Sequence, residues 1–474
     1  MILTVLLAYF LLLLLVSHWA GSGGNEAFFR AGRRSPWPLV AFGMVGASIS
    51  GLTFIGVPGW VMGIDMTYMQ MCLGFIVGYL LVALVLLPVY YRLGLPSIYM
   101  YLERRFGAVS YRTGASFFIL SKLLGAAAKF YVVVQILQVC VGDRYGVPYW
   151  LMALCTLLLI WLYTRRSGIQ ALVWTDVLQT FVLIAALLLI LWHVCRMLGM
   201  GAGEALSAVW HDGHSRMFEF ADWTSTQHFC KQFVSGIFVV LVMTGLDQDM
   251  MQKNLTCKDL RSAQLDMCSY GLLFAPVNFL FLSLGVLLLM LYAKMGLPLP
   301  EKGDALLSGV VCSGVLGSAA LVLFTVGVVA SAFSSADSAL TALTTCFCVD
   351  ILKREHDETA RKWAHLAMML AFLLCTLAFN AIGSGSVMNL IYTLVSYTYG
   401  PLLGLFAFGL FTKMQPRDRA VPYIAVASPL ICYLIDLIAL HGFGYKFGYE
   451  MLMFNGLLTF FGLWLSWLWG KPVA

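Results

Sequence analysis

The sequence predicts an all-α polytopic membrane protein. Of its 474 residues, 61% are hydrophobic and only 11% are charged, and the mean hydropathy is +0.87. Apolar runs of about twenty residues, the length that crosses a bilayer as a helix, recur along the chain. A soluble globule needs more polar surface than this composition supplies. We therefore expect a bundle of transmembrane helices and no separate soluble domain.

About thirteen segments are long and apolar enough to be transmembrane helices. The predicted spans are residues 2–19, 37–63, 67–91, 108–140, 147–164, 169–195, 228–250, 264–293, 311–346, 363–382, 385–412, 421–441 and 449–470.

Basic residues set the expected orientation. Most of the 29 lysines and arginines lie in one set of alternate connections, among them Arg104, Lys253 and Lys353. The positive-inside rule therefore places the N-terminus outside and the C-terminus in the cytoplasm, in the cell (inner) membrane. The same bias explains the net charge of +6, so we expect a lipid bilayer as partner and no nucleic acid. The polar run LDQDMMQKN ends the seventh span on the cytoplasmic side, where a solvated helix end explains it at least as well as a gate.

A stripe of hydroxyls runs along one face of an otherwise apolar helix. Ser331, Ser334, Ser335 and Ser338 are spaced i, i+3, i+4 and i+7, so they share a helix face. In a membrane such a face points inward, and its oxygens are suited to a hard cation such as Na⁺ on an ion pathway. A packing seam of small residues is the alternative interpretation.

The second span contains a segment that weakens its helix. Gly51, Gly56, Pro58 and Gly59 interrupt the run SISGLTFIGVPG. Unwound backbone is tolerated inside a membrane where it lines an enclosed cavity, and discontinuous helices bind solute and ions in secondary transporters. A kink without function is the alternative.

Corresponding interruptions predict an internal repeat. The seventh span carries FVSGIFVVLVMTGLDQD, five spans after SISGLTF. Two five-helix halves of opposite orientation fit this spacing. We divide the single membrane domain, 1–474, into a peripheral first helix and loop (1–36), a first repeat (37–196), an external loop with the second repeat (197–412) and two peripheral helices (413–474).

Five motifs together resemble the sodium:solute symporter family over nearly the whole chain. They are AGRRSPW at 31–37, SGLTFIGVPG at 50–59, YLERRFG at 101–107, WTD at 174–176 and SSADSALTALTTCFCVDILK at 334–353. The resemblance implies a five-plus-five inverted core of the amino-acid/sodium symporter type, with sodium-coupled import of a small polar solute by alternating access.

The resemblance also implies the ligands of the main sodium ion. They are the carbonyls of Gly46, Ile49 and Ser331 and the hydroxyls of Ser334 and Ser335.

Some members of the family hold a further sodium ion, for which Asp176 and Ser338 match here. Asp337 stands where some members have a hydroxyl or small residue, which puts this ion in doubt, and Asp176 closing a cytoplasmic gate is the alternative.

The solute is less specified by the sequence. The resemblance places Thr53 and Gln70 at substrate positions. Lys122 and Lys129 lie seven residues apart on one helix face, and a buried amine in a transporter core meets an anion or an acidic side chain. If Lys129 binds substrate, a sugar acid such as sialic acid is expected. If Lys122 instead reaches the interface and Lys129 pairs with an aspartate, a neutral sugar is expected.

Rival classes fit the residues less well. No His, Asp or Glu constellation converges near a membrane face, so we expect no enzyme. The scattered cysteines and histidines show no metal-ligand spacing, so sodium is the only ion expected. A cation channel or a transporter-derived sensor remains the alternative, and no sequence pattern specifies an oligomeric state.

Overall fold

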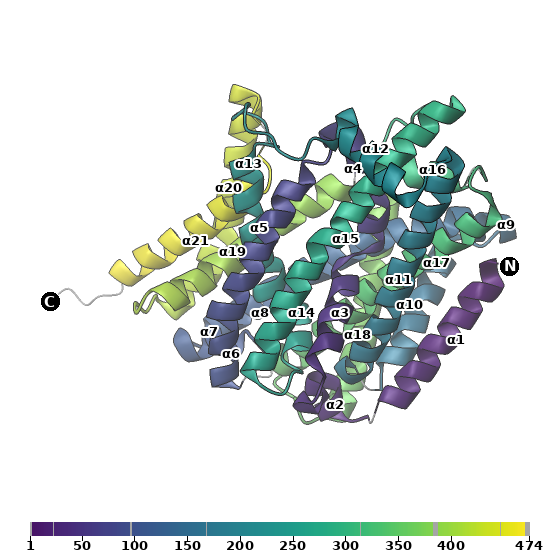
Figure 1. Cartoon of the computed structure of the whole chain (residues 1–474). Helices are drawn as coiled ribbons and strands as arrows, with labels where there is room; N and C mark the ends of the chain where they lie inside the picture. Colours follow the sequence, from purple (N-terminus) through teal and green to yellow (C-terminus); the bar gives the residue numbers. More distant parts are fainter. Residues whose placement is uncertain are drawn as a thin grey trace.

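In the computed structural model the chain is described for residues 2–21, 23–94, 97–166, 168–312, 314–382, 387–445 and 447–469. Within these ranges the protein is built from helices, without a β-strand. The helices form one bundle, with α1 (Ile2–Ala20) at one edge and α20 (Val421–Phe443) and α21 (Glu450–Leu468) at the opposite edge (Figure 1). The predicted all-α class is confirmed.

The other helices follow in chain order. They are α2 (Asn25–Arg30), α3 (Trp37–Ser48), α4 (Gly51–Ile64), α5 (Tyr68–Leu81), α6 (Leu87–Leu93), α7 (Met100–Arg105), α8 (Ala108–Leu137), α9 (Asp143–Tyr145), α10 (Tyr149–Thr164), α11 (Ile169–Leu198), α12 (Ala202–His211), α13 (Phe229–Val240), α14 (Gln248–Asn254), α15 (Leu260–Met295), α16 (Ala305–Cys312), α17 (Gly317–Cys346), α18 (Glu358–Ile382) and α19 (Val387–Phe411). Short π-helical turns continue several of them: η2 (Val82–Leu86), η3 (Gln138–Gly142), η5 (Leu241–Gly245) and η6 (Phe347–Ile351).

Within the described part of the chain, nine helices are long and apolar enough to cross a membrane, or up to twelve if each bent helix pair is one span. Helix α10 is a shorter apolar helix. Each predicted span holds a helix or a bent pair. The span predicted at 311–346 begins instead at Gly317, because Gly314 and Gly317 take left-handed φ values of 79° and 76° that end α16 and separate it from α17.

The predicted weak point of the second span is a sharp bend. Helices α3 and α4 meet at 63° across Ile49 and Ser50. Ser50 takes an extended conformation and caps α4, its side chain accepting a hydrogen bond from the amide of Thr53. The break therefore falls before Gly51, and Pro58 lies within α4 without interrupting it.

The span predicted at 228–250 is bent as well. Helices α13 and α14, joined by η5, meet at 70°. Asp247 caps α14, its side chain accepting a hydrogen bond of 2.9 Å from the amide of Asp249. Both spans whose interruptions led to the prediction of a repeat are therefore bent.

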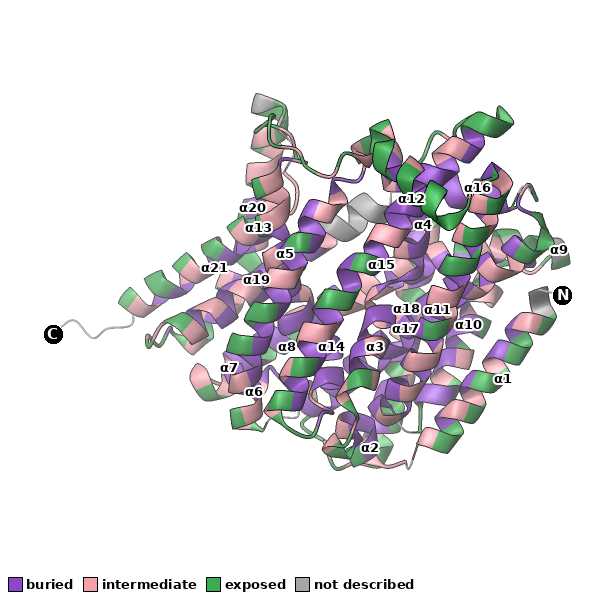
Figure 2. Cartoon of the chain, in the orientation of Figure 1, coloured by how far each residue is buried: buried purple, intermediate pink, exposed green. Residues whose placement is uncertain are grey.

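Burial separates the central helices from the peripheral ones. In the most apolar window, 67% of residues are buried for both α15 and the α17–η6 helix, against 17% for the helix that contains α20. Figure 2 shows the same contrast, with exposed residues along α1 and α21 and buried residues at the centre. Since α15 and α20 are both strongly apolar, their difference in burial comes from position in the bundle.

Close packing of α3 against α11 fixes the region of the bend. A Cβ atom added at Gly46 would lie 1.9 Å from Oγ1 of Thr180, and one at Gly43 would lie 3.0 Å from the Cβ of Asp176. Only glycine permits this approach. The end of α3 is therefore held beside the WTD motif of α11.

Candidate functional site

The bend between α3 and α4 redirects two backbone amides. In a continuous helix the amides of Ser50 and Thr53 would donate to the carbonyls of Gly46 and Ile49. Instead, Ser50 donates to the carbonyl of Ser48 at 3.1 Å and Thr53 donates to Oγ of Ser50 at 3.4 Å. The carbonyls of Gly46 and Ile49, both predicted to bind sodium, therefore lose their helical donors.

The hydroxyl stripe of α17 faces this bend. Ser335 Oγ donates a hydrogen bond of 3.1 Å to the carbonyl of Ala47. Ser331 Oγ bonds instead to the carbonyl of Val328 within its own helix, at 3.2 Å. Ser331 and Ser334 are fully buried. The structure thus brings α17 and the end of α3 together, as the interpretation of the stripe requires.

Ser334 points to a carboxylate on α11. Its Oγ donates a hydrogen bond of 2.6 Å to Oδ1 of Asp176. The other carboxylate oxygen, Oδ2, lies 2.7 Å from Nζ of Lys253 on α14. The side chains of Asp176 and Lys253 are 1% and 2% exposed, so this is a buried ion pair.

Lys253 corrects a sequence-based expectation. Its charge places it with the basic residues of the cytoplasmic connections, whereas the fold buries it. The rest of α14 is buried too, including Gln248, Gln252 and Asn254, so the polar run is not a solvated helix end. No local signal predicts this, because the bend at Leu246 and Asp247 turns α14 into the bundle.

Ser338 is paired with a different carboxyl group from the predicted one. Its Oγ donates to Oδ1 of Asp337 at 3.3 Å, and the hydroxyl of Tyr163 donates to Oδ2 of Asp337 at 2.5 Å. Asp337 is fully buried. Asp176 and Ser338, predicted to share one ion, therefore have different partners: Asp176 contacts Ser334 and Lys253, whereas Ser338 contacts Asp337.

A central cavity of about 200 Å³ lies next to the bend. Its lining includes Thr53, a predicted substrate residue, and both lysines of α8, Lys122 and Lys129. Ser335 lines it as well, so the sodium ligands proposed on α17 adjoin this space. A solute in the cavity would contact both halves of the bent α3–α4 helix.

The two lysines have different surroundings. Lys122 Nζ lies 3.0 Å from Oδ2 of Asp247 and 2.7 Å from Oδ2 of Asp249. The hydroxyl of Tyr399 adds a hydrogen bond of 2.9 Å to Asp247. Lys129 forms no ion pair within the described ranges. Both aspartates thus pair with Lys122, whereas one alternative from the sequence paired an aspartate with Lys129.

Gln70 lies outside the central cavity lining. Its side-chain amide donates to the carbonyls of Thr67 and Gln227 at 3.2 and 2.9 Å, and its Oε1 accepts from the amide of Glu219 at 3.0 Å. These bonds fasten the loop after α12 to the start of α5. The expectation of a substrate contact at Gln70 is therefore not supported by its position.

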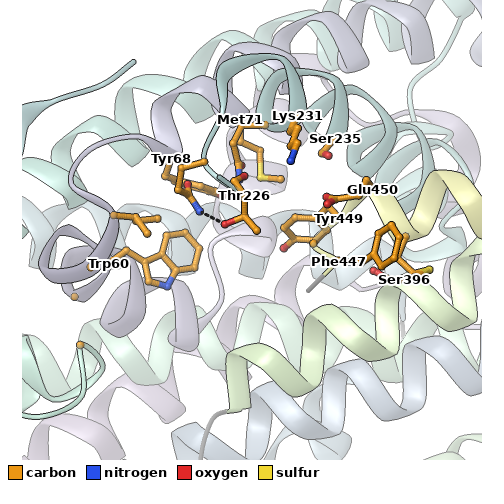
Figure 3. A pocket seen from close by; sticks show the side chains of 18 of the residues that line it. Trp60, Tyr68, Met71, Thr226, Lys231, Ser235, Ser396, Phe447, Tyr449 and Glu450 are labelled. Carbon is orange, nitrogen blue, oxygen red and sulfur yellow. Dashed lines mark hydrogen bonds between the residues drawn. The ribbon is translucent and has the colours of Figure 1, made fainter. Parts of the chain in front are cut away.

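A second, larger cavity of about 720 Å³ adjoins the first (Figure 3). Trp60, Tyr68 and Tyr449 line both cavities and so stand between them. Lys231, Thr226 and Glu450 line the larger cavity only, and they lie on the side that the predicted orientation places outside. The two cavities therefore share a boundary of three aromatic side chains.

Two bent helices, a buried polar cluster and a central cavity are typical of one class of protein, the polytopic membrane transporters. The sequence model of the sodium:solute symporter family matches residues 28–420. The chain belongs to this family, whose members are sodium-coupled solute transporters rather than enzymes.

Individual relatives support the family assignment. The chain is 28% identical to the human sodium/iodide cotransporter over 85% of this chain and 65% of that protein. It is 26% identical to the sodium/sialic acid symporter SiaT of Proteus mirabilis, over 89% of this chain and 87% of the relative. It is 25% identical to the sodium/sialic acid symporter NanT of Aliivibrio fischeri, over 92% and 87%.

Solved structures share the fold. A Na⁺-coupled sialic acid symporter in its substrate-bound outward-open state matches with a TM-score of 0.84 and 20% identity, over 99% of this chain and 98% of that one. The closed form of Mhp1, a nucleobase-cation-symport-1 family transporter, matches with a TM-score of 0.53 and 14% identity, over 95% of each chain.

Proposed function

We propose that this protein is a sodium-coupled symporter that imports a small anionic solute by alternating access. Sodium is bound by the carbonyls of Gly46, Ile49 and Ser331 and the hydroxyls of Ser334 and Ser335. One observation carries the proposal: Ser335 contacts the end of α3 where two carbonyls lose their helical donors. Neutral oxygens at a helix break are the usual sodium ligands in secondary transporters.

The solute's charge is inferred from the central cavity. Lys122 forms ion pairs with Asp247 and Asp249, which leaves Lys129 as the lysine of the cavity lining without an ion pair within the described ranges. A buried ammonium is stabilised by a counter-ion, and a carboxylate on the solute supplies one. The names of three relatives give iodide, sialic acid and monocarboxylates as their solutes, and all of these are anions. A sugar acid such as sialic acid is the leading solute, with Thr53 as a hydrogen-bonding contact; a neutral sugar is the alternative.

The proposal includes the membrane arrangement. Thirteen spans, counting each bent pair and α10 once, cross the cell membrane with the N-terminus outside and the C-terminus in the cytoplasm. The bends of 63° and 70° support inverted repeats at 37–196 and 197–412. Residues 1–36 and 413–474 then form peripheral elements, in agreement with the low burial of α20.

Uptake into proteoliposomes tests the function. Purified protein is reconstituted, an inward Na⁺ gradient is imposed, and uptake of radiolabelled sialic acid is followed against an equal K⁺ gradient. We expect saturable uptake that requires Na⁺. Sodium current without saturable uptake of sialic acid or any screened anion or sugar would support a channel, and Na⁺-independent uptake would overturn symport.

A further inference from the structure

A cation of the chain already occupies the place predicted for a second sodium ion: the ammonium of Lys253 is paired with Asp176. Asp176 uses one oxygen to accept the hydroxyl proton of Ser334 at 2.6 Å, and its other oxygen faces the ammonium of Lys253 at 2.7 Å. Neither Asp176 Oδ2 nor Lys253 Nζ has a hydrogen-bond partner within the described ranges, so each depends on the ion pair.

The remaining predicted ligand, Ser338, is bonded to a different carboxylate. Ser338 donates to Asp337, whose other oxygen is bonded by Tyr163. A sodium ion at Asp176 would therefore have to displace the ammonium from the carboxylate and reorient Ser338. Bringing a second positive charge beside a fully buried ammonium is electrostatically unfavourable.

We propose that the Lys253 ammonium takes the place of the second sodium ion, so that this transporter couples one sodium ion to each solute. The inference rests on the proposed function for the main sodium ion and for the solute, and on the ion pair of Asp176 and Lys253 for the absence of a second ion. An ammonium on the chain neutralises Asp176 as a bound ion would, but it cannot leave the protein. It therefore neutralises the charge of Asp176, but it carries no sodium ion down the gradient that drives transport.

Lys253 also connects the site to the second bent helix. It lies in the last turn of α14, whereas Ser334 and Asp176 belong to α17 and α11. The carboxylate of Asp176 thus joins a proposed ligand of the main sodium ion to the bent helix of the other half. This position makes Lys253 a positioning residue as well as a fixed counter-charge.

Equilibrium binding of ²²Na⁺ to the purified full-length protein tests the inference without knowledge of the solute. We expect one ion per chain for the wild type and two for Lys253→Met, which keeps the length of the side chain but removes its charge. The matched control Lys253→Arg should retain one ion. The double variant Lys253→Met/Asp176→Asn should return to one, since it lacks both charges.

Two bound ions in the wild type, or one ion in a folded Lys253→Met, would overturn the inference. If Lys253→Met does not fold, the wild-type count decides: one ion supports the inference and two overturn it. If the wild type binds no sodium, the sodium site of the proposed function fails. In that case a Lys253→Met protein that gains one ion still supports a fixed cation at Asp176, and one that gains none overturns it.

Discussion

Ser335 on α17 donates its hydroxyl proton to the carbonyl of Ala47, one residue before the end of α3, across 3.1 Å. This bond joins one of the most buried helices of the bundle to the half-helix that ends at the bend. A sodium ion at the neighbouring carbonyls of Gly46 and Ile49 would hold the same two helices together. In the proposed function, release of the ion removes that link and lets the bend change its angle, which couples sodium to alternating access.

Ser335→Ala should remove most of the stabilisation that sodium gives the protein. At a hundred times its Kd, a ligand stabilises a protein by about 2.7 kcal/mol, and the variant should lose most of this because it lacks a ligand hydroxyl. Thermal unfolding with increasing NaCl, against choline chloride, measures the effect. Ser331→Ala is the matched control, since that hydroxyl bonds within its own helix and the proposed ligand is the main chain. Equal sodium shifts in both variants would contradict the assignment.

Gly46→Ala should destabilise the protein and weaken sodium binding together. The new Cβ would lie 1.9 Å from Oγ1 and 3.0 Å from the Cα of Thr180, so α3 and α11 must separate. Overpacking of this kind costs about 1–3 kcal/mol or more. Gly125→Ala in α8 is the control, because a Cβ there meets nothing within 4 Å. A Gly46→Ala protein with wild-type thermal stability would show that α3 is free to shift.

The stripe and the bend could be predicted because their signals are local. Hydroxyl spacing fixes a helix face, and a glycine cluster next to serines weakens a helix, whatever the rest of the fold does. The residue at which the helix breaks is harder to predict, because Ser50 caps α4 whereas Pro58 lies inside α4. Pro58 packs beside Gly285 of α15: a Cβ atom added at Gly285 would lie 2.2 Å from the carbonyl oxygen of Pro58. This contact joins segments that are distant in the sequence.

The charged part of the site depended on tertiary structure. Spacing places Lys122 and Lys129 on one face of α8. The bend before α14 sets the position of Asp247 and Asp249, and therefore which of the two lysines they contact. Lys253 is buried for the same reason, since α14 follows that bend. The partners of Gln70, Gln227 and Glu219, could not be predicted either, because they belong to a loop about 150 residues later.

Asp176→Asn should lower stability more than Lys253→Met/Asp176→Asn does. Removing one partner of a buried ion pair leaves the other charge uncompensated and costs about 3–5 kcal/mol, whereas removing both costs much less. Thermal unfolding of the single and double variants at fixed NaCl gives the comparison. Asp247→Asn is a useful reference, because Lys122 retains Asp249 as a partner. Additive losses from the two substitutions would mean that the Asp176 and Lys253 side chains are not coupled.

Lys129→Gln should selectively weaken binding of an anionic solute. A hydrogen bond to a charged group contributes about 1.5–3 kcal/mol, and 1.4 kcal/mol corresponds to tenfold in affinity, so we expect a loss of about 10–100-fold. Competition of uptake by sialic acid and by its carboxamide measures the effect, and the amide should lose little, because it offers no negative charge to the ammonium. Thr53→Ala is the matched control: it removes a neutral contact from the same cavity and should weaken both competitors alike. If Lys129→Gln leaves sialic acid as much stronger a competitor than its carboxamide as in the wild type, Lys129 does not bind the charged group of the solute. A neutral sugar then becomes the leading candidate.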